Sequence, residues 1–291
     1  MFESWCAHRN IISGRAVRWP SDRPEVQSFS GALMTNTAEY KDFAVALARE
    51  AGAIMRKHFG IHIAVESKAD GAPLTIADTT INQLVMDRIS TTYPDFGIIT
   101  EEAPEVKTNS LYTWVCDPLD GTLPFSCGIP VFTFSLALCE NGTPIVGVVY
   151  DPMMDRLFTA EKGKGAWLNE KTKLEVSKLP FSGSIASVAS LTMGPYGNNL
   201  KSKYKLWAPH FYSFVASAMQ VALGNFTAAR FDWTTPWDGA AVAIIVREAG
   251  GRVTNDEGKD QRYDRPILGV VATNGVVHDE VLALIREYAV R

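Results

Sequence analysis

The chain has 291 residues, and with 46% hydrophobic, 21% charged and 10% aromatic positions its composition is typical of a folded globular protein and excludes a largely disordered one. Lysine and arginine number 28 against 32 aspartate and glutamate residues, and the net charge of -4 supplies no positive field for a nucleic-acid backbone. No apolar run approaches the roughly 20 residues that cross a bilayer, so we expect a soluble, cytoplasmic protein with neither nucleic acid nor a membrane as partner.

A regular hydrophobic pattern begins only after the N-terminal segment. Residues 1–36 show no sustained period, so we expect a mobile arm there, and a true chain start near Met34 is the alternative. Apolar residues then recur at helical spacing over 37–59, where Gly60 ends the run, and again from 78 to about 91. The sequence therefore predicts two helices behind an arm.

The hydrophobic period then changes to the alternation that is typical of strands. The strands predicted in this part of the chain are 97–100, 112–116, 131–138, 145–150 and 157–160. The dipeptide Asn141-Gly142 predicts a hairpin turn between the third and the fourth of them. We expect a mostly antiparallel sheet beside the two helices.

Strands and helices alternate more evenly after about residue 174, which is typical of an α/β arrangement. The predicted helices of this part are 211–223, 238–249 and 279–289, and the predicted buried strands are 185–189 and 267–273. The pattern divides the chain into an arm at 1–36, an α+β lobe at 37–173 and an α/β lobe at 174–291.

Acidic residues stand at the ends of apolar segments, where an unneutralised charge is unfavourable. They are Glu101 and Glu102 after one segment, Asp117 and Asp120 after a second, and Asp238 after a Pro-Trp pair. Pro118 stiffens the turn between Asp117 and Asp120, so both carboxylates can face one point. Carboxylate and carbonyl oxygens are the ligands that Mg²⁺ selects, and such sites usually hold phosphate as well.

Gly121 and Thr122 follow these carboxylates directly. If a helix begins there, its free N–H groups face an anion, and metal and phosphate would share one turn. Taken alone, residues 117–122 are equally well explained as an ordinary turn after a strand, because Asp, Pro and Gly are common turn residues. The other segments have to decide between the two.

Four segments together resemble the inositol monophosphatase family of magnesium-dependent, lithium-sensitive phosphatases. Residues 114–125 match the family motif W-[IV]-x-D-P-[IL]-D-G-T-x-x-F, and 237–251 match a second motif that begins W-D-x-A-A and ends E-A-G-G. Residues 68–78 resemble K-x-D-G-S-P-V-T-x-A-D, and 100–102 resemble G-E-E. The likeness covers the chain from about residue 38 to its end, and four ordered motifs are far more specific than one.

The resemblance implies a fold, a metal content and roles for individual residues. The fold is a five-layered αβαβα sandwich of α+β/α/β type, in which 37–173 holds metal and phosphate and 174–291 completes the active site. The residues implied to hold two or three Mg²⁺ ions are Glu101, Asp117, the Leu119 carbonyl, Asp120 and Asp238. Thr122 and Asp78 would position or deprotonate the attacking water, with Glu101 as a second contact. The family likeness also implies a homodimer.

The same resemblance implies the contacts with a small phosphorylated metabolite. The residues carried over as substrate-binding are Lys68, Leu119, Asp120, Gly121, Thr122 and Asp238. For Lys68 a solvated surface charge is as good an interpretation, because exposed lysines are common.

Some positions depart from the family pattern. Pro124 stands where many members have Asn, Asn82 where an acidic residue commonly follows, and Thr100 where Gly precedes the paired glutamates; none of these removes a metal ligand. Phe231 stands at the family position that supplies a carboxylate to inositol hydroxyls, and a phenylalanine accepts no hydrogen bond. Asp232 could substitute if the loop shifts by one residue.

We therefore expect a metal-dependent phosphomonoester hydrolase, with inositol 1-phosphate as the leading substrate. The alternatives are histidinol phosphate, fructose 1,6-bisphosphate and 3′-phosphoadenosine 5′-phosphate, the last being least favoured because no aromatic or basic wall can be placed for adenine. A catalytically silent regulatory protein on the same fold is the non-enzyme alternative. The complete set of implied metal ligands argues against silence.

Overall fold

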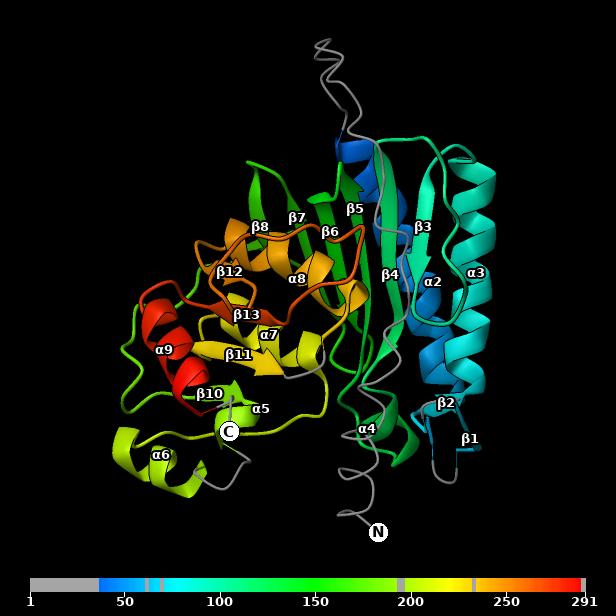
Figure 1. The fold of residues 1–291 in the computed structure, drawn as a ribbon. Helices are drawn as coiled ribbons and strands as arrows, with labels where there is room; N and C mark the ends of the chain where they lie inside the picture. The colour runs from blue at the N-terminus through cyan, green and yellow to red at the C-terminus, as the bar shows by residue number, and fades with distance from the viewer. Residues whose placement is uncertain (1–36, 61–62, 69–70, 193–196, 232–233, 289–291) are drawn as a thin grey trace.

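The computed structural model describes residues 37–60, 63–68, 71–192, 197–231 and 234–288. The expected N-terminal arm and Asp232 lie outside these ranges. Helices and sheets of the described residues alternate in five layers, with a seven-stranded and a four-stranded sheet each covered by helices on both faces (Figure 1). This is the layer order of the αβαβα sandwich that the family likeness implies.

The first layer consists of α2 (Thr37–His58) and α3 (Ile76–Thr92), which cover one face of the larger sheet. Both helices are predicted by the sequence. α2 buries a stripe that includes Leu47, Ala51 and Met55, and this spacing of four residues places the three side chains on one helix face. The stripe packs on the sheet together with the fully buried Trp114.

The seven-stranded sheet follows the chain order without a crossover. Its strands are β3 (Gly97–Thr100), β4 (Tyr112–Asp120), β5 (Thr133–Glu140), β6 (Thr143–Asp151), β7 (Arg156–Glu161), β8 (Gly165–Leu168) and β9 (Thr172–Lys173). β3 and β4 run parallel, and every later pair is antiparallel. The predicted, mostly antiparallel sheet is therefore confirmed.

At two places in this sheet the sequence favours a turn, and the structure has a turn at only one of them. Asn141 and Gly142 have φ of 49° and 75°, the left-handed conformations that a tight hairpin turn needs, so the predicted hairpin is confirmed. β4, in contrast, is predicted to end at Cys116 but continues to Asp120, because residues after Cys116 still pair with β5. The segment that could be an ordinary turn is thus the end of a strand.

The remaining layers come from the second half of the chain. α7 (Phe214–Ala222) and α8 (Pro236–Glu248) lie between the two sheets. The four-stranded sheet has the order β10 (Ala186–Val188), β11 (Ala228–Phe231), β13 (Val270–Thr273) and β12 (Arg252–Thr254). Its other face is covered by α5 (Ala189–Thr192) and α9 (His278–Tyr288), and α6 (Gly197–Tyr204) packs on α5.

α8 approaches the larger sheet at Gly147 of β6. A Cβ atom built on this glycine would lie 2.4 Å from Ile244 Cγ2 and 3.1 Å from the Ala241 carbonyl oxygen. Only a residue without a side chain therefore lets α8 lie this close to β6. The close packing holds the first turn of α8 beside the end of β4.

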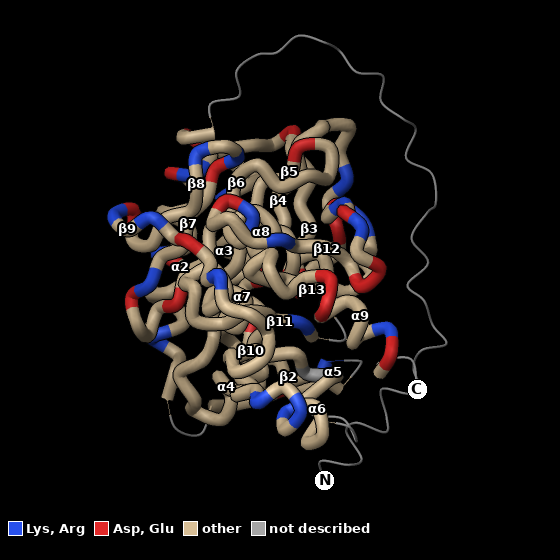
Figure 2. Tube along the Cα trace, turned by 90° about the vertical axis from the view of Figure 1, so that its left-hand side faces the viewer, with Lys and Arg blue, Asp and Glu red and all other residues tan. Residues whose placement is uncertain are grey.

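Several short elements are not predicted by the sequence. They are the hairpin strands β1 (Val65–Ser67) and β2 (Pro73–Thr75), the strands β8, β9, β11 and β12, and the helices α5 and α6. The sequence allows a helix after Gly121 only conditionally, and α4 (Thr122–Ser126) begins there. In the view of Figure 2, basic and acidic positions of the described chain alternate along the surface rather than form a continuous basic stripe. Within the described ranges, the helices lack the combination of length and apolar character that a membrane span requires.

Candidate active site

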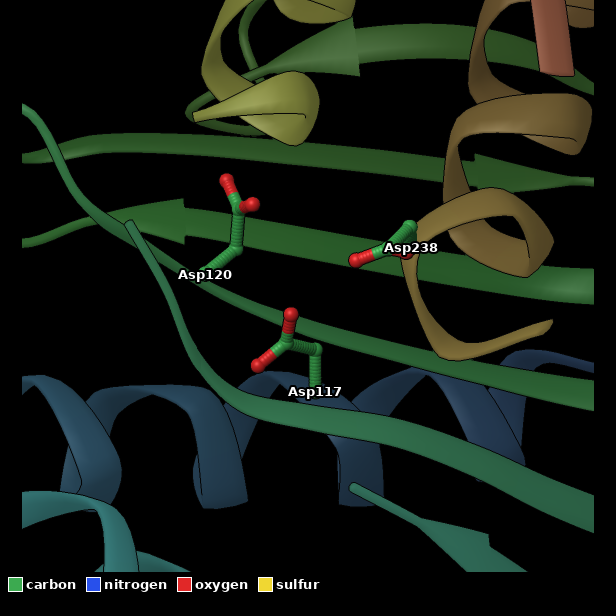
Figure 3. A group of neighbouring side chains, drawn as sticks. All are labelled: Asp117, Asp120 and Asp238. Atoms are coloured by element: carbon green, nitrogen blue, oxygen red, sulfur yellow. The ribbon is translucent and has the colours of Figure 1, made fainter. Parts of the chain in front are cut away.

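Three aspartates meet where β4 ends and α8 begins. Asp117 and Asp120 come from the last part of β4, and Asp238 comes from the first turn of α8 (Figure 3). One carboxylate oxygen of each lies within 4.8 Å of the corresponding oxygen of the other two. Asp117 is 1% exposed and Asp120 is 8% exposed, so these charges are removed from bulk water.

A bulge in β4 brings Asp117 and Asp120 to the same side of the sheet. Residues three apart in a regular strand point to opposite faces. Here Asp117 pairs with Ser135 and Asp120 pairs with Thr133, so β4 uses one residue more than β5 between the two pairs. Because Ser135 and Thr133 share a face, the two aspartates share it as well.

Asp238 is placed by the N-terminal cap of α8. Its Oδ2 accepts hydrogen bonds from the backbone N–H of Thr235 at 2.5 Å and from the Thr235 hydroxyl at 2.8 Å. This is the reciprocal capping arrangement of a Thr-x-x-Asp sequence, with Pro236 at the helix start. The cap fixes one oxygen of Asp238 and directs the other away from the helix.

Each aspartate therefore uses one oxygen for structure. Asp117 Oδ1 accepts from the Leu119 N–H at 3.0 Å. Asp120 Oδ2 accepts from the Ser213 hydroxyl and from the Val215 N–H at 3.2 Å. Among the described residues, no hydrogen bond is made to the second oxygen of any of the three aspartates. Two buried carboxylates and the half-buried carboxylate of Asp238, each with a spare oxygen, are a donor set that fits a hard divalent cation such as Mg²⁺.

The electrostatics of the cluster also favour a cation. Burial, followed by the charges of Glu101, Asp120 and Asp238, raises the pKa of Asp117 well above its ordinary value. Burial likewise raises the pKa of Asp120 to about 6, and burial with the neighbouring Asp120 charge raises that of Asp238 to about 8. These carboxylates repel one another when ionised, and a bound cation reverses this effect.

We expect the stability of the metal-free protein to fall as the pH rises toward 8. The folded protein keeps protons on Asp117 and Asp238 that the unfolded chain releases near pH 4, so the free energy of unfolding decreases between about 4 and 8. Burial lowers the pKa of His278 to about 4. Below about pH 6.5 this shift makes the free energy of unfolding increase with pH, which opposes the effect of the aspartates. The informative range is therefore from about pH 6.5 to 8.

Urea unfolding in this range, with EDTA or with Mg²⁺, measures the effect. We expect a negative slope with EDTA and a much smaller one with Mg²⁺, because the cation keeps the aspartates ionised in the folded state. Equal slopes under the two conditions would contradict the cation site, and the absence of a negative slope with EDTA would contradict the raised pKa values.

Glu101 lies at the edge of this cluster rather than within it. It follows β3, its side chain is 27% exposed, and its Oε1 accepts a hydrogen bond from Lys68 Nζ at 2.6 Å. Lys68 also forms an ion pair with Glu102. The Lys68 side chain is 18% exposed, so it is not the solvated surface lysine of the alternative interpretation.

Thr122 and Asp78 lie together, although they are far apart in the chain. The Thr122 hydroxyl lies 3.0 Å from Asp78 Oδ1 and 3.1 Å from the Leu119 carbonyl oxygen, and it can donate to either. Asp78 is 1% exposed, burial raises its pKa, and its Oδ2 accepts from the Thr75 N–H and hydroxyl at 2.8 and 2.6 Å. Asp78 thus caps α3 as Asp238 caps α8.

Gly121 makes the turn between β4 and α4. Its φ of 92° is left-handed, and a Cβ atom there would lie 2.7 Å from the Val131 carbonyl oxygen. The helix that the sequence allows at this point does begin at Thr122, but it ends at Ser126. The turn therefore brings the Leu119 carbonyl, Gly121 and Thr122 beside the aspartates.

Sequence reasoning missed several residues that support the site. They are Thr75, Thr235 and Ser213, which donate hydrogen bonds to the aspartates. The two Thr-x-x-Asp segments are a local signal for capping and could have indicated Thr75 and Thr235. Ser213 precedes an apolar helix, which predicts an N-cap, but no local pattern indicates its contact with Asp120.

Phe231, one of the departures from the family pattern, packs against a residue beside the site. Its ring lies 5.9 Å from that of Phe214, nearly edge to face at 68°. Phe214 directly follows Ser213, which binds Asp120, and Phe231 ends β11 four positions before Thr235. The aromatic contact therefore joins the segment that follows Ser213 to the end of β11.

Comparison with known proteins gives a consistent result. The model of the inositol monophosphatase family matches residues 36–289. The histidinol-phosphatase of Mycobacterium tuberculosis is 33% identical over 249 residues, which cover 82% of this chain and 95% of that protein. The Nus factor SuhB of Escherichia coli is 33% identical over 259 residues, covering 84% of this chain and 95% of the relative.

Among solved structures, that of Thermotoga maritima IMPase has a TM-score of 0.78 and 30% identity, and covers 86% of this chain and 98% of that one. The shared fold confirms the five-layered sandwich. Members of the matched family are metal-dependent hydrolases of phosphoric monoesters, and so is this protein. The chain belongs to the inositol monophosphatase family.

Proposed function

We propose that the protein hydrolyses a small phosphorylated alcohol and that two or three Mg²⁺ ions are held by carboxylate and carbonyl oxygens at the end of β4. The proposed ligands are Glu101, Asp117, the Leu119 carbonyl, Asp120 and Asp238. The observation that carries the proposal is the cluster of three aspartates, two buried and one half-buried, whose ligand oxygens lie within 4.8 Å of one another and which each have a spare oxygen. When bound, Mg²⁺ supplies charge stabilisation at the phosphoryl oxygens and makes water more acidic.

The remaining chemistry is assigned to residues of the chain. If Thr122 donates its single hydroxyl hydrogen to Asp78, the Thr122 oxygen is left as an acceptor for the attacking water. Asp78 is held on its other oxygen by Thr75 and cannot turn away. Thr122 and Asp78 therefore orient the water and receive its proton, with Glu101 as a second contact.

The phosphate is proposed to lie against the turn at the start of α4. The backbone of Gly121 and Thr122 follows Asp120 there, and Lys68, which pairs with Glu101, supplies an ammonium group. Together with Leu119, Asp120 and Asp238, these residues form the proposed phosphate-binding set.

Inositol 1-phosphate is the first substrate to test, because the family match and the motifs support it. Histidinol phosphate is the second candidate, and Phe231 favours it. The Phe214 ring is buried, but the half-buried Phe231 ring can offer an imidazole an aromatic partner, whereas it accepts no hydrogen bond from a polyol. 3′-Phosphoadenosine 5′-phosphate, the least favoured candidate, is included in the test for completeness.

Phosphate release from these esters and from fructose 1,6-bisphosphate, with and without Mg²⁺, tests the proposal. We expect Mg²⁺-dependent release from at least one ester. The absence of release from every ester would contradict the proposed substrates and metal. A homodimer, inhibition by lithium and a cytoplasmic location are proposed from the family likeness.

Replacing Phe231 with glutamate should shift the preference toward inositol 1-phosphate. A carboxylate there can accept hydrogen bonds from vicinal hydroxyls, each worth about 1 kcal/mol or somewhat more, so we expect roughly a tenfold change in the ratio of kcat/KM values for inositol 1-phosphate and histidinol phosphate. Phe231→Leu is the control, because it removes the ring without adding an acceptor. A common factor for all substrates would show that Phe231 does not contact the alcohol.

A further inference from the structure

Lys68 lies between two carboxylates of unequal surroundings. Its Nζ is 2.6 Å from Glu101 Oε1 and forms a still shorter contact with Glu102 Oε1. The Glu102 side chain is 7% exposed, whereas that of Glu101 is 27% exposed and borders the aspartate cluster. One ammonium group therefore neutralises a buried carboxylate and a carboxylate at the edge of the site.

Among the described residues, no other lysine or arginine pairs with the acidic groups of the site. The acidic groups in or beside the site are Asp78, Glu101, Glu102, Asp117, Asp120 and Asp238. In the described ranges, Lys68 is the sole lysine or arginine that forms an ion pair with any of them. Lys68 therefore supplies a large part of the positive charge that neutralises these carboxylates. A divalent cation bound at Glu101 would compete with the Lys68 ammonium for the Glu101 carboxylate.

The backbone at Lys68 belongs to a small two-stranded hairpin. Lys68 follows β1, and β1 pairs only with β2, with three residues in each strand. The Lys68 N–H donates to the Ala72 carbonyl at 2.8 Å, and the Gly71 N–H donates to the Lys68 carbonyl at 2.9 Å. A two-stranded hairpin of this size is marginally stable by itself, so the ammonium can move without disturbing the sheet.

We propose that Lys68 is an internal competitor for the cation at Glu101: its ammonium neutralises Glu101 when the ion is absent and remains with Glu102 when the ion binds. The inference rests on the proposed role of Glu101 as a ligand. It gives Glu102, which is not among the proposed metal ligands, the role of retaining the displaced ammonium. Lys68 is thus a positioning residue that sets the affinity for metal, separately from any contact with phosphate.

Mg²⁺ titration calorimetry in the absence of phosphate tests the proposal on the full chain. Lys68→Met removes the competing charge, and we expect the Kd of the Glu101 ion to fall by roughly three- to tenfold. Lys68→Arg restores a cation and should return the Kd to within about twofold of the wild type. Lys41→Met removes a lysine paired with Glu170 on another surface, and it should leave the Kd unchanged.

The melting temperature Tm, measured with and without Mg²⁺, distinguishes an effect on metal binding from a folding defect. Without metal, Lys68→Met leaves Glu101 and Glu102 unpaired, so we expect a lower Tm than in the wild type and a larger increase in Tm on adding Mg²⁺. In a double-mutant cycle, Glu102→Gln should raise the Kd in the wild type more than in Lys68→Met, because Glu102 acts mainly through the ammonium.

The outcomes separate this inference from the proposed function. An unchanged or higher Kd in Lys68→Met, with wild-type Mg²⁺ binding intact, would overturn the competition and leave the phosphatase proposal standing. A wild-type protein that binds no Mg²⁺ would overturn the proposed function, and the competition with it. If Lys68→Met binds Mg²⁺ more tightly but has the Tm of the wild type in the absence of metal, the result still supports competition, because the proposal concerns the affinity for Mg²⁺.

Discussion

Replacing Asp238 with asparagine should lower kcat by several orders of magnitude while the protein stays folded. Asp238 brings a negative charge from the first turn of α8 to the aspartate cluster, and the neutral amide removes one of the three charges that would hold Mg²⁺. The amide oxygen can still accept the hydrogen bond from the Thr235 N–H, so the cap of α8 is retained. Phosphate release by the purified variant measures the loss.

The stability of this variant separates a catalytic effect from misfolding. Since burial and the charge of Asp120 raise the pKa of Asp238 to about 8, its ionised form is unfavourable without metal. Near pH 8 and with EDTA, we therefore expect the Asp238→Asn protein to be at least as stable as the wild type, whereas Mg²⁺ should raise its Tm less. Asp260→Asn, at an exposed ion pair with Arg247, is the matched control and should keep normal turnover. Near wild-type kcat in folded Asp238→Asn would contradict the assignment.

Local patterns predicted most helices and strands because the residues that create the pattern are neighbours in the chain. β3 at Gly97–Thr100 has the predicted bounds, and α2 ends one position from the predicted residue 59. The end of β4 was missed for a physical reason. Asp, Pro and Gly favour a turn locally, but pairing with β5 and a bulge keep residues 117–120 in the strand.

The site was less accessible to the sequence because distant residues complete it. The family likeness places Asp117, Asp120 and Asp238 in one group, and the structure brings them together. It also puts Glu101 in that group, but here the Glu101 side chain pairs with Lys68 at the edge. Ser213 binds Asp120 across 93 positions of sequence, a contact that only the packing of α7 between the sheets creates.

Replacing Thr122 with alanine should lower kcat by roughly 10²–10⁴-fold and change KM much less, because general base catalysis contributes about this factor. The Thr122 hydroxyl is held between Asp78 and the Leu119 carbonyl, and alanine offers no atom in its place. The contribution appears mainly when the nucleophile forms, so the transition state is affected more than substrate binding. Steady-state kinetics on the best ester of the panel measure the division between kcat and KM.

Thr122→Ser is the matched control, because it keeps the hydroxyl and removes only a methyl group from a residue that is 9% exposed. We expect this variant to keep kcat within about tenfold of the wild type, since the serine hydroxyl can make the same hydrogen bond to Asp78. Asp78→Asn should resemble Thr122→Ala, because an amide can turn its donor group toward Thr122 and reverse the direction of the bond. If Thr122→Ala raises KM and leaves kcat unchanged, Thr122 binds the phosphate and another group activates the water.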